Sequence, residues 1–230
     1  DVLRYHLRSK HFFDVQAELP QKHMDWDSQP SPWLAYAGAP TAELPTALLP
    51  EAAGWRQRRA PAPAELSPAS LGSFLRLGAG ISAWKSHDGT HKWALRVAPS
   101  SGNLQTTELH LLLPGGLGAP LADQPAAYHY RPDRHSLELR AGVPRELVQG
   151  TDGEAVGFVA VFTSICLREA WKYGERALRS CHLSAARPGG KVFGHPSSYS
   201  FSFFPSSAFS SSSSSSSSSC PLLQHEAAWK

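Results

Sequence analysis

Cysteine is scarce in this sequence, which has three in 230 residues, Cys166, Cys181 and Cys220, and no Cys-x-x-Cys pair. An odd, unclustered set argues against a disulfide framework and against a structural zinc site, and it is typical of a reducing compartment. Charge is scarce too, since charged residues make up 18% of the chain and the net charge is +3. So small a net charge favours neither a nucleic-acid partner nor an anionic membrane surface. We therefore expect a cytoplasmic protein that binds neither.

Long apolar runs are missing as well. No stretch approaches the ~20 apolar residues that a membrane helix needs, and no basic-then-apolar leader opens the chain. The first residue is Asp1 rather than methionine, which is compatible with a fragment that has lost a targeting segment. There is neither a Gly-x-Ser-x-Gly elbow nor a His-Glu-x-x-His helix, so a hydrolase lacks its nucleophile or its metal. The catalytic residues stay unassigned.

Composition divides the chain into three parts. Residues 1–65 form a leader and a Pro/Ala-rich linker, whereas residues 66–183 have the apolar periodicity of a domain with a core. Residues 184–230, here called the tail, contain 17 serines, ten of them consecutive from Ser210 to Ser219. A segment of this composition buries too little apolar surface to offset the entropy lost on ordering it. We expect the tail to be disordered.

The middle part predicts an α+β domain, with a mostly antiparallel sheet flanked by helices. Ser67 and Pro68 supply an N-cap and a proline at the first helical position. The pair Asp88-Gly89 is a hairpin signal, and a turn there removes the helical spacing with which His87 and His91 would chelate a metal. Alternating and apolar runs predict four strands, of which the last is a central one: 107–113, 126–131, 136–140 and 155–163.

A further helix is expected after residue 166. Apolar residues recur there at helical spacing, namely Leu167, Ala170, Trp171, Gly174 and Leu178. Four cations lie between them, Arg168, Lys172, Arg176 and Arg179. In one interpretation these cations form a solvated face, and in the other one arginine reaches a cofactor or a partner subunit. The helical pattern is expected to end at Arg187-Pro-Gly-Gly190.

The stretch from Arg96 to Glu108 combines a cation, a proline and a glycine just before the apolar run 109–113. Pro99 fixes φ and Gly102 permits a positive φ, so the backbone turns sharply with its N–H groups pointing one way. With Arg96 close by, such a loop suits a phosphate or the polar edge of a planar cofactor. The other interpretation is an ordinary turn before a core strand.

The motif Arg-x-Ala-Pro-Ser-x-Gly-x-x-x-x-x-Glu in this stretch resembles the flavin-binding signature of the nitroreductase superfamily. It is most similar to that of the SagB-type branch, the thiazole/oxazole-forming peptide dehydrogenases. Two more segments are similar to that branch and follow in the expected order, one within residues 5–40 and one at Arg168–Arg179. The resemblance covers residues 2–183 with gaps and stops where related proteins continue through a Gly-His pair. We therefore expect an incomplete nitroreductase-like domain, truncated or altered after Leu183.

The resemblance implies FMN as the cofactor and a homodimer with the flavin at the subunit interface. Five positions carry over as flavin contacts: Arg96, Ser100, Ser101, Gly102 and Asn103. The implied function is an FMN-dependent oxidoreductase acting on a small electrophile or a peptide azoline, with NAD(P)H as a candidate electron donor. Two alternatives stay open, a non-catalytic nitroreductase-fold binding module and an inactive truncated fragment. No metal is implied.

Overall fold

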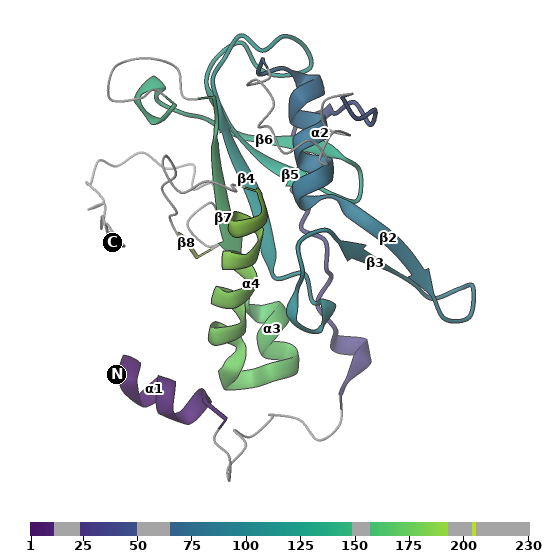
Figure 1. Ribbon diagram of the computed structural model, residues 1–230, viewed down its shortest axis with the longest axis vertical. Helices are drawn as coiled ribbons and strands as arrows, with labels where there is room; N and C mark the ends of the chain where they lie inside the picture. Colours follow the sequence, from purple (N-terminus) through teal and green to yellow (C-terminus); the bar gives the residue numbers. More distant parts are fainter. Residues whose placement is uncertain (12–23, 50–64, 149–156, 193–203, 206–230) are drawn as a thin grey trace, which may run out of the picture.

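A six-stranded mixed sheet is the main element of the chain, whose computed structural model describes residues 1–11, 24–49, 65–148, 157–192 and 204–205 (Figure 1). The strand order is β1-β6-β5-β4-β7-β8, and only the β7–β8 pair is parallel. The strands are β1 (Thr41–Glu43), β4 (Thr107–Leu113), β5 (Ala126–Arg131), β6 (Ser136–Gly142), β7 (Val159–Ser164) and β8 (Phe204–Pro205). The predicted α+β class with a mostly antiparallel sheet is confirmed.

Four of the six strands follow the predicted pattern, whereas β1 lies in the segment predicted as leader and linker and β8 in the predicted tail. β4 and β5 have the predicted bounds, and β6 ends at Gly142 rather than at Arg140. β7 begins at Val159, and residues 155–156 of the predicted strand lie outside the described part of the chain. β7 pairs with β4 along its whole length, whereas β8 covers it only at Thr163 and Ser164. Within the part of the chain that the structure describes, the strand predicted as central is thus flanked on both sides only at its C-terminal end.

Helix α2 (Pro68–Ala79) packs on the sheet, and a capping box sets its start (Figure 1). The Ser67 hydroxyl accepts from the Ser70 N–H at 3.2 Å, and the Ser70 hydroxyl accepts from the Ser67 N–H at 2.9 Å, so the predicted N-cap is confirmed. Leu71 and Leu75 are fully buried against the sheet. They share one core with apolar side chains of the strands, among them Leu109, Leu111, Leu113, Tyr128, Tyr130 and Leu137.

The predicted amphipathic helix is in fact two helices, α3 (Cys166–Tyr173) and α4 (Ala177–Val192), joined by a 3-10 turn at Gly174–Arg176. Gly174 has φ 52° and ψ −126°, a conformation that residues with a Cβ adopt only with strain. The chain folds back there into a helical hairpin (Figure 1). The apolar pattern predicted that Gly174 lies on one continuous helix face, whereas the chain turns at Gly174 from α3 toward α4.

Helix α4 also runs past its predicted stop. The prediction that the helix ends at Arg187–Gly190 is wrong, because α4 reaches Val192. Cys181, Ser184 and Ala185 are buried, and α4 packs on β4 and β7. Tertiary packing of a helix commonly outweighs the helix propensity of single residues. Here it outweighs the low helix propensity of Pro188, Gly189 and Gly190.

Only part of the tail belongs to the described residues. Residues 184–192 lie in α4, and β8 pairs with the end of β7, so the prediction of disorder is wrong at these positions. A short strand such as β8 gains its main-chain hydrogen bonds from the open edge of β7. Residues 193–203 and 206–230 lie outside the described residues, so their disorder stays a prediction.

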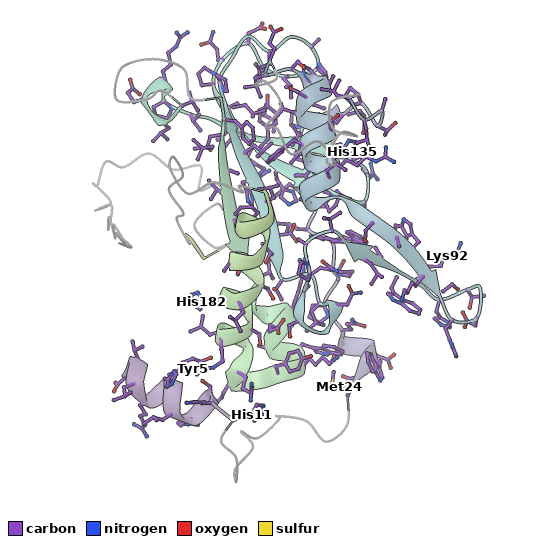
Figure 2. All side chains as sticks on the ribbon, viewed as in Figure 1. Tyr5, His11, Met24, Lys92, His135 and His182 are labelled. Atoms are coloured by element: carbon purple, nitrogen blue, oxygen red, sulfur yellow. The ribbon has the colours of Figure 1, made fainter. Side chains whose placement is uncertain are left out.

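Helix α1 (Val2–Ser9) lies at the start of α4 (Figure 2). The Tyr5 hydroxyl accepts from the Arg179 N–H at 3.1 Å, and the Arg179 guanidinium donates to the Ser9 hydroxyl at 3.0 Å. Arg179 therefore binds the leader of this chain. Nothing in this arrangement brings it to the loop that carries Arg96.

The strands β2 (Ile81–Ser86) and β3 (Lys92–Arg96) form the hairpin that Asp88-Gly89 predicts, with Lys92 toward its outer end (Figure 2). In its turn, the Asp88 carboxylate accepts from the His91 N–H at 2.7 Å. Across the described ranges, no three His, Cys, Asp or Glu side chains gather to hold a metal. Within the same ranges, no helix combines the length and apolarity needed to span a membrane.

Candidate functional site

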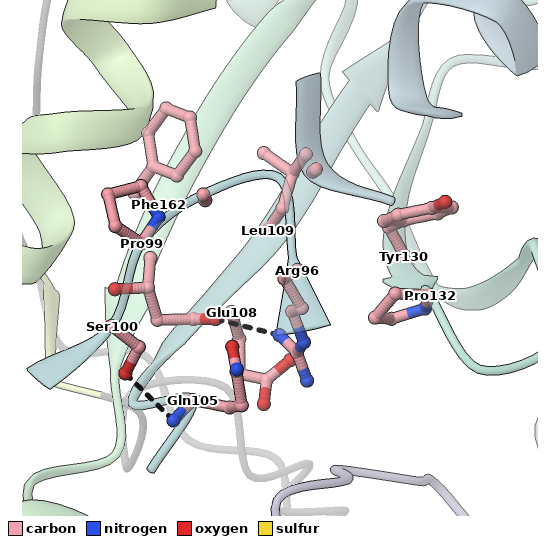
Figure 3. Close-up of a pocket in the computed structure, with 12 residues that line it drawn as sticks. Arg96, Pro99, Ser100, Gln105, Glu108, Leu109, Tyr130, Pro132 and Phe162 are labelled. Atoms are coloured by element: carbon pink, nitrogen blue, oxygen red, sulfur yellow. Dashed lines mark hydrogen bonds between the residues drawn. The ribbon is translucent and has the colours of Figure 1, made fainter. Parts of the chain in front are cut away.

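The candidate site lies in the loop between β3 and β4, whose middle is the 3-10 turn Ser101–Asn103. The polar groups of this loop bond largely to one another. The Ser100 hydroxyl accepts from the Gln105 N–H at 2.8 Å (Figure 3), and the Gln105 side-chain amide donates to Asn103 Oδ1 at 2.6 Å. Asn103 Nδ2 donates to the Ala94 carbonyl of β3 at 3.1 Å. The loop is therefore a small folded unit rather than an open turn.

Arg96 ends β3 and is held by the main chain. Its guanidinium donates to the Pro32 carbonyl at 2.9 Å and to the Thr107 carbonyl at 3.2 Å, and it lies 5.2 Å from the centre of the Trp33 ring. Burial lowers the pKa of Arg96, and the Glu108 carboxylate nearby opposes that effect. Arg96 Nε is buried and has no hydrogen-bond partner in the described part of the chain. The cation is thus fixed in place and retains donors for another acceptor.

Gly102 brings the loop against helix α3. Its φ is +57°, and a Cβ at this position would lie 2.8 Å from Tyr173 Oη and 3.2 Å from Lys172 Nζ. Both the positive φ and the close approach favour glycine. The visible role of Gly102 is therefore to let the loop pack on α3, and its predicted contact with a cofactor stays a prediction.

Ser101 faces α3 as well, where the buried side chain of Glu169 lies. Among the described residues, neither carboxyl oxygen of Glu169 has a partner at hydrogen-bond distance. Burial raises the pKa of Glu169, although the positive charge of Lys172 favours the carboxylate. All five predicted residues thus lie together, four in the loop and Arg96 directly before it.

Next to the loop, a row of alternating charges crosses the sheet. Arg168 of α3 donates to Glu108 of β4 at 2.5 Å, and the other oxygen of Glu108 lies 3.1 Å from His129 Nε2 of β5. His129 Nδ1 lies 3.0 Å from Glu138 of β6, which also accepts from Arg131 at 2.9 Å. We call this row the charge network; its members are Arg168, Glu108, His129, Glu138, Arg131 and Asp133.

The centre of the charge network is deeply buried, whereas Arg131 and Asp133 at its end are partly exposed. Glu108 is 1% exposed and His129 is 0% exposed. Each ring nitrogen of His129 lies at hydrogen-bond distance from one carboxylate, Nε2 from Glu108 and Nδ1 from Glu138. Burial acts to raise the pKa of Glu108, but the hydrogen bond from His129 and the charges of Arg96 and Arg168 outweigh it, and the pKa lies below its usual value.

Reasoning from the sequence missed this network. The prediction that Arg168 belongs to a solvated helix face is wrong, because Arg168 is 3% exposed and paired with Glu108. Burying a guanidinium this deeply costs several kcal/mol unless a carboxylate and hydrogen bonds compensate for the lost water. The sequence does contain a pattern that could have predicted the network. Each of three apolar strand segments contains one charged or imidazole side chain, namely Glu108, His129 or Glu138. Buried polar groups need partners, so such residues are expected to meet across the strands.

A cavity of about 30 Å³ lies beside Arg96, Ser100, Gln105 and Glu108 (Figure 3). Ligand pockets usually measure about 300–1,000 Å³, so this cavity does not admit the isoalloxazine ring of FMN. The polar groups suit the cofactor better than the volume does, because Arg96 lines the cavity and its buried Nε has no hydrogen-bond partner among the described residues. The described residues of one chain fit a phosphate or a polar edge of FMN but do not enclose the whole cofactor.

Comparison with known proteins gives a fold for the chain. No family model and no curated protein matches the sequence. A solved structure of a putative nitroreductase from Anabaena variabilis, 23% identical, matches with a TM-score of 0.59 over 83% of this chain and 37% of that chain. This match shows that the chain has the nitroreductase fold. The chain spans little more than a third of the length of that protein.

Two further solved structures match with a TM-score of 0.41 each. One, of the same description, is from Ralstonia eutropha, with 18% identity over 70% of this chain and 72% of that chain. The other is the microcin synthetase McbBCD complex of E. coli with truncated pro-MccB17 bound, with 20% identity over 83% of this chain and 76% of that chain.

Replacing Gly102 by alanine should destabilise the fold more than replacing Gly89. Both glycines have a positive φ, so each alanine costs about 1–2 kcal/mol of backbone strain. A Cβ at Gly89 meets nothing within 4 Å, whereas one at Gly102 collides with Tyr173. We expect Gly102→Ala to lose about 1–3 kcal/mol more unfolding free energy than Gly89→Ala, measured by urea denaturation. Equal losses would show that the loop does not press on α3.

Stability should fall as the pH drops from about 6.5 to about 4, because of His110. Its ring lies 5.0 Å from that of His129, and burial lowers its pKa to about 4. Between these pH values the unfolded chain binds a proton at residue 110 that the folded chain does not, so stability rises with pH there, by at most about 3 kcal/mol. In the variant His110→Gln, this part of the pH dependence should disappear from urea-denaturation curves. An unchanged slope would mean that His110 titrates alike in both states.

Proposed function

We propose that this chain supplies one wall of an FMN site in a flavin-dependent oxidoreductase, and that a second copy of the chain supplies the other wall. The nitroreductase fold supports this function but does not by itself assign an activity. The observation that carries it is Arg96, a half-buried cation that main-chain carbonyls fix beside a polar loop while its buried Nε stays unused. The small cavity agrees with a site that one chain does not complete.

In this function Arg96 provides a fixed positive charge for the phosphate or for a ring oxygen of FMN. Ser100, Ser101 and Asn103 provide hydroxyl and amide groups for ring and ribityl atoms. Gly102 keeps the backbone of the loop close to α3. Bound flavin supplies the redox chemistry, the exchange of a hydride with a substrate. The residues of the chain bind and orient, and none of them is assigned as an acid, a base or a nucleophile.

The substrate class follows from the resemblance of the loop to SagB-type dehydrogenases. We propose a small electrophile or a peptide azoline, with NAD(P)H as the electron donor where the substrate is reduced. An azoline is oxidised to an azole with loss of two electrons and two protons, so that reaction needs an electron acceptor rather than a donor. A requirement for an electron donor would therefore indicate a substrate that is reduced, and a requirement for an electron acceptor would indicate an azoline.

One observation favours a second function, a non-catalytic binding module with the nitroreductase fold. The Ser100 hydroxyl and Asn103 Oδ1 already accept hydrogen bonds within the loop, Asn103 Nδ2 donates to the Ala94 carbonyl of β3, and the cavity beside Ser100 measures about 30 Å³. A loop whose polar groups already bond to one another gains less from a ligand. A truncated chain without activity would share this property. Flavin binding separates the oxidoreductase from both alternatives.

The purified chain should bind FMN, and Arg96→Ala should weaken that binding. A charge-assisted hydrogen bond contributes roughly 1.5–3 kcal/mol, so the dissociation constant should rise about 10- to 150-fold in a titration that follows flavin fluorescence. Arg145→Ala is the matched control, because Arg145 is exposed and belongs to a short turn far along the chain from the loop. Its dissociation constant should equal that of the unmutated chain.

Two outcomes would contradict the proposed function. If the unmutated chain does not bind FMN at protein concentrations that favour self-association, the binding module becomes the better description. If Arg96→Ala and Arg145→Ala have the same dissociation constant, the flavin does not contact Arg96. Thermal unfolding of both variants checks that they are folded during the titration.

A further inference from the structure

Arg168 connects helix α3 to the end of the candidate loop. Its Nη1 donates to the Gln105 carbonyl and to Glu108 Oε1, both at 2.5 Å. Gln105 is the last loop residue whose N–H and side chain bond back into the loop, and Glu108 is the second residue of β4. One buried guanidinium nitrogen therefore holds both the end of the loop and the start of the strand.

We infer that Arg168 is a positioning residue of the candidate site, which fixes the conformation of residues 100–105; this inference rests on the function proposed above. Gln105 adopts φ 56°, an unfavourable value for a residue with a Cβ. Such a backbone persists only where its surroundings hold it. The bond from Arg168 to the Gln105 carbonyl is a charge-assisted one in a site that excludes water, and it supplies that restraint.

The arrangement requires arginine at this position. Nη1 carries two hydrogens, one for the carbonyl of Gln105 and one for the carboxylate of Glu108, and the planar guanidinium fixes the angle between them. An ammonium group is a compact charge on a flexible stem, and it retains the attraction to Glu108 without that fixed fork. A neutral side chain loses both. Lysine should thus restore part of the restraint, and glutamine little of it.

The other end of the charge network offers a matched control. Arg131 donates to Glu138 at 2.9 Å and to Asp133 at 2.8 Å, and its side chain is 11% exposed. It lies on β5 and makes none of its hydrogen bonds with the loop. Arg131→Gln therefore removes a partly buried cation from the same network while leaving residues 100–105 in contact with Arg168.

The test compares hydrogen exchange of loop and core amides by NMR in the unmutated chain and in Arg168→Gln, Arg168→Lys and Arg131→Gln. The loop amides are those of Leu104 and Gln105, which bond to Ser101 and Ser100, and the reference amide is that of Leu111 in β4. We expect the ratio of loop to reference exchange to rise at least tenfold in Arg168→Gln, to rise less in Arg168→Lys, and to stay unchanged in Arg131→Gln. A general loss of stability raises the rate of the core amide at least as much as that of the loop amides, because the core amide exchanges through global unfolding, so by itself it does not raise the ratio.

FMN titration of the same four proteins provides the second measurement. The dissociation constant should rise in the order unmutated chain, Arg168→Lys, Arg168→Gln, and Arg131→Gln should match the unmutated chain. An unchanged exchange ratio in both Arg168 variants would overturn the inference, and so would equal ratios in Arg168→Gln and Arg131→Gln. If Arg168→Gln does not fold, Arg168→Lys decides alone. If the unmutated chain binds no FMN, the proposed function fails while the exchange ratio still decides whether Arg168 positions the loop.

Discussion

The carboxylate of Glu108, buried at the start of a central strand, is the constraint on which the rest of the structure depends. A charge at 1% exposure costs several kcal/mol unless cations and hydrogen bonds satisfy it. The two partners come from different elements, Arg168 from α3 and His129 from β5. Satisfying one carboxylate therefore fixes the helical hairpin against the sheet and the pairing of β4 with β5 at the same time. Glu138 and Arg131 extend the same requirement to β6.

The candidate site depends on the same buried ion pair between Arg168 and Glu108. Arg168 binds the loop at Gln105 as well as Glu108, so the pairing that stabilises the sheet also sets the backbone from which Ser100 and Asn103 project. Arg96 is fixed on the other side by main-chain carbonyls. A preorganised loop with a fixed cation and little internal volume suits part of the proposed flavin site, whose other wall we propose comes from a second copy of the chain.

Four of the six strands were predictable from the sequence because their signals are local, whereas the short strands β1 and β8 depend on pairing with distant edges of the sheet. Alternation and apolar runs set β4 and β5, and Ser67 with Pro68 sets the start of α2. The corner at Gly174 was not predictable, because a glycine at an apolar helical position reads as part of the face. The continuation of α4 depends on burial of Cys181 and Ala185, which is a tertiary effect. The prediction of a solvated position for Arg168 was wrong because its partner Glu108 lies 60 residues away in the sequence, outside any local pattern.

A double-mutant cycle between Arg168 and Glu108 tests the central role of this ion pair most directly. Urea denaturation of Arg168→Gln, Glu108→Gln and the double variant gives the coupling free energy of the two side chains. Breaking a buried pair from one side leaves an uncompensated charge and costs about 3–5 kcal/mol, whereas removing both charges costs far less than the sum. We predict a coupling free energy of about 2 kcal/mol or more. Additive losses, with a coupling near zero, would contradict the claim that this pair holds the sheet and the loop together.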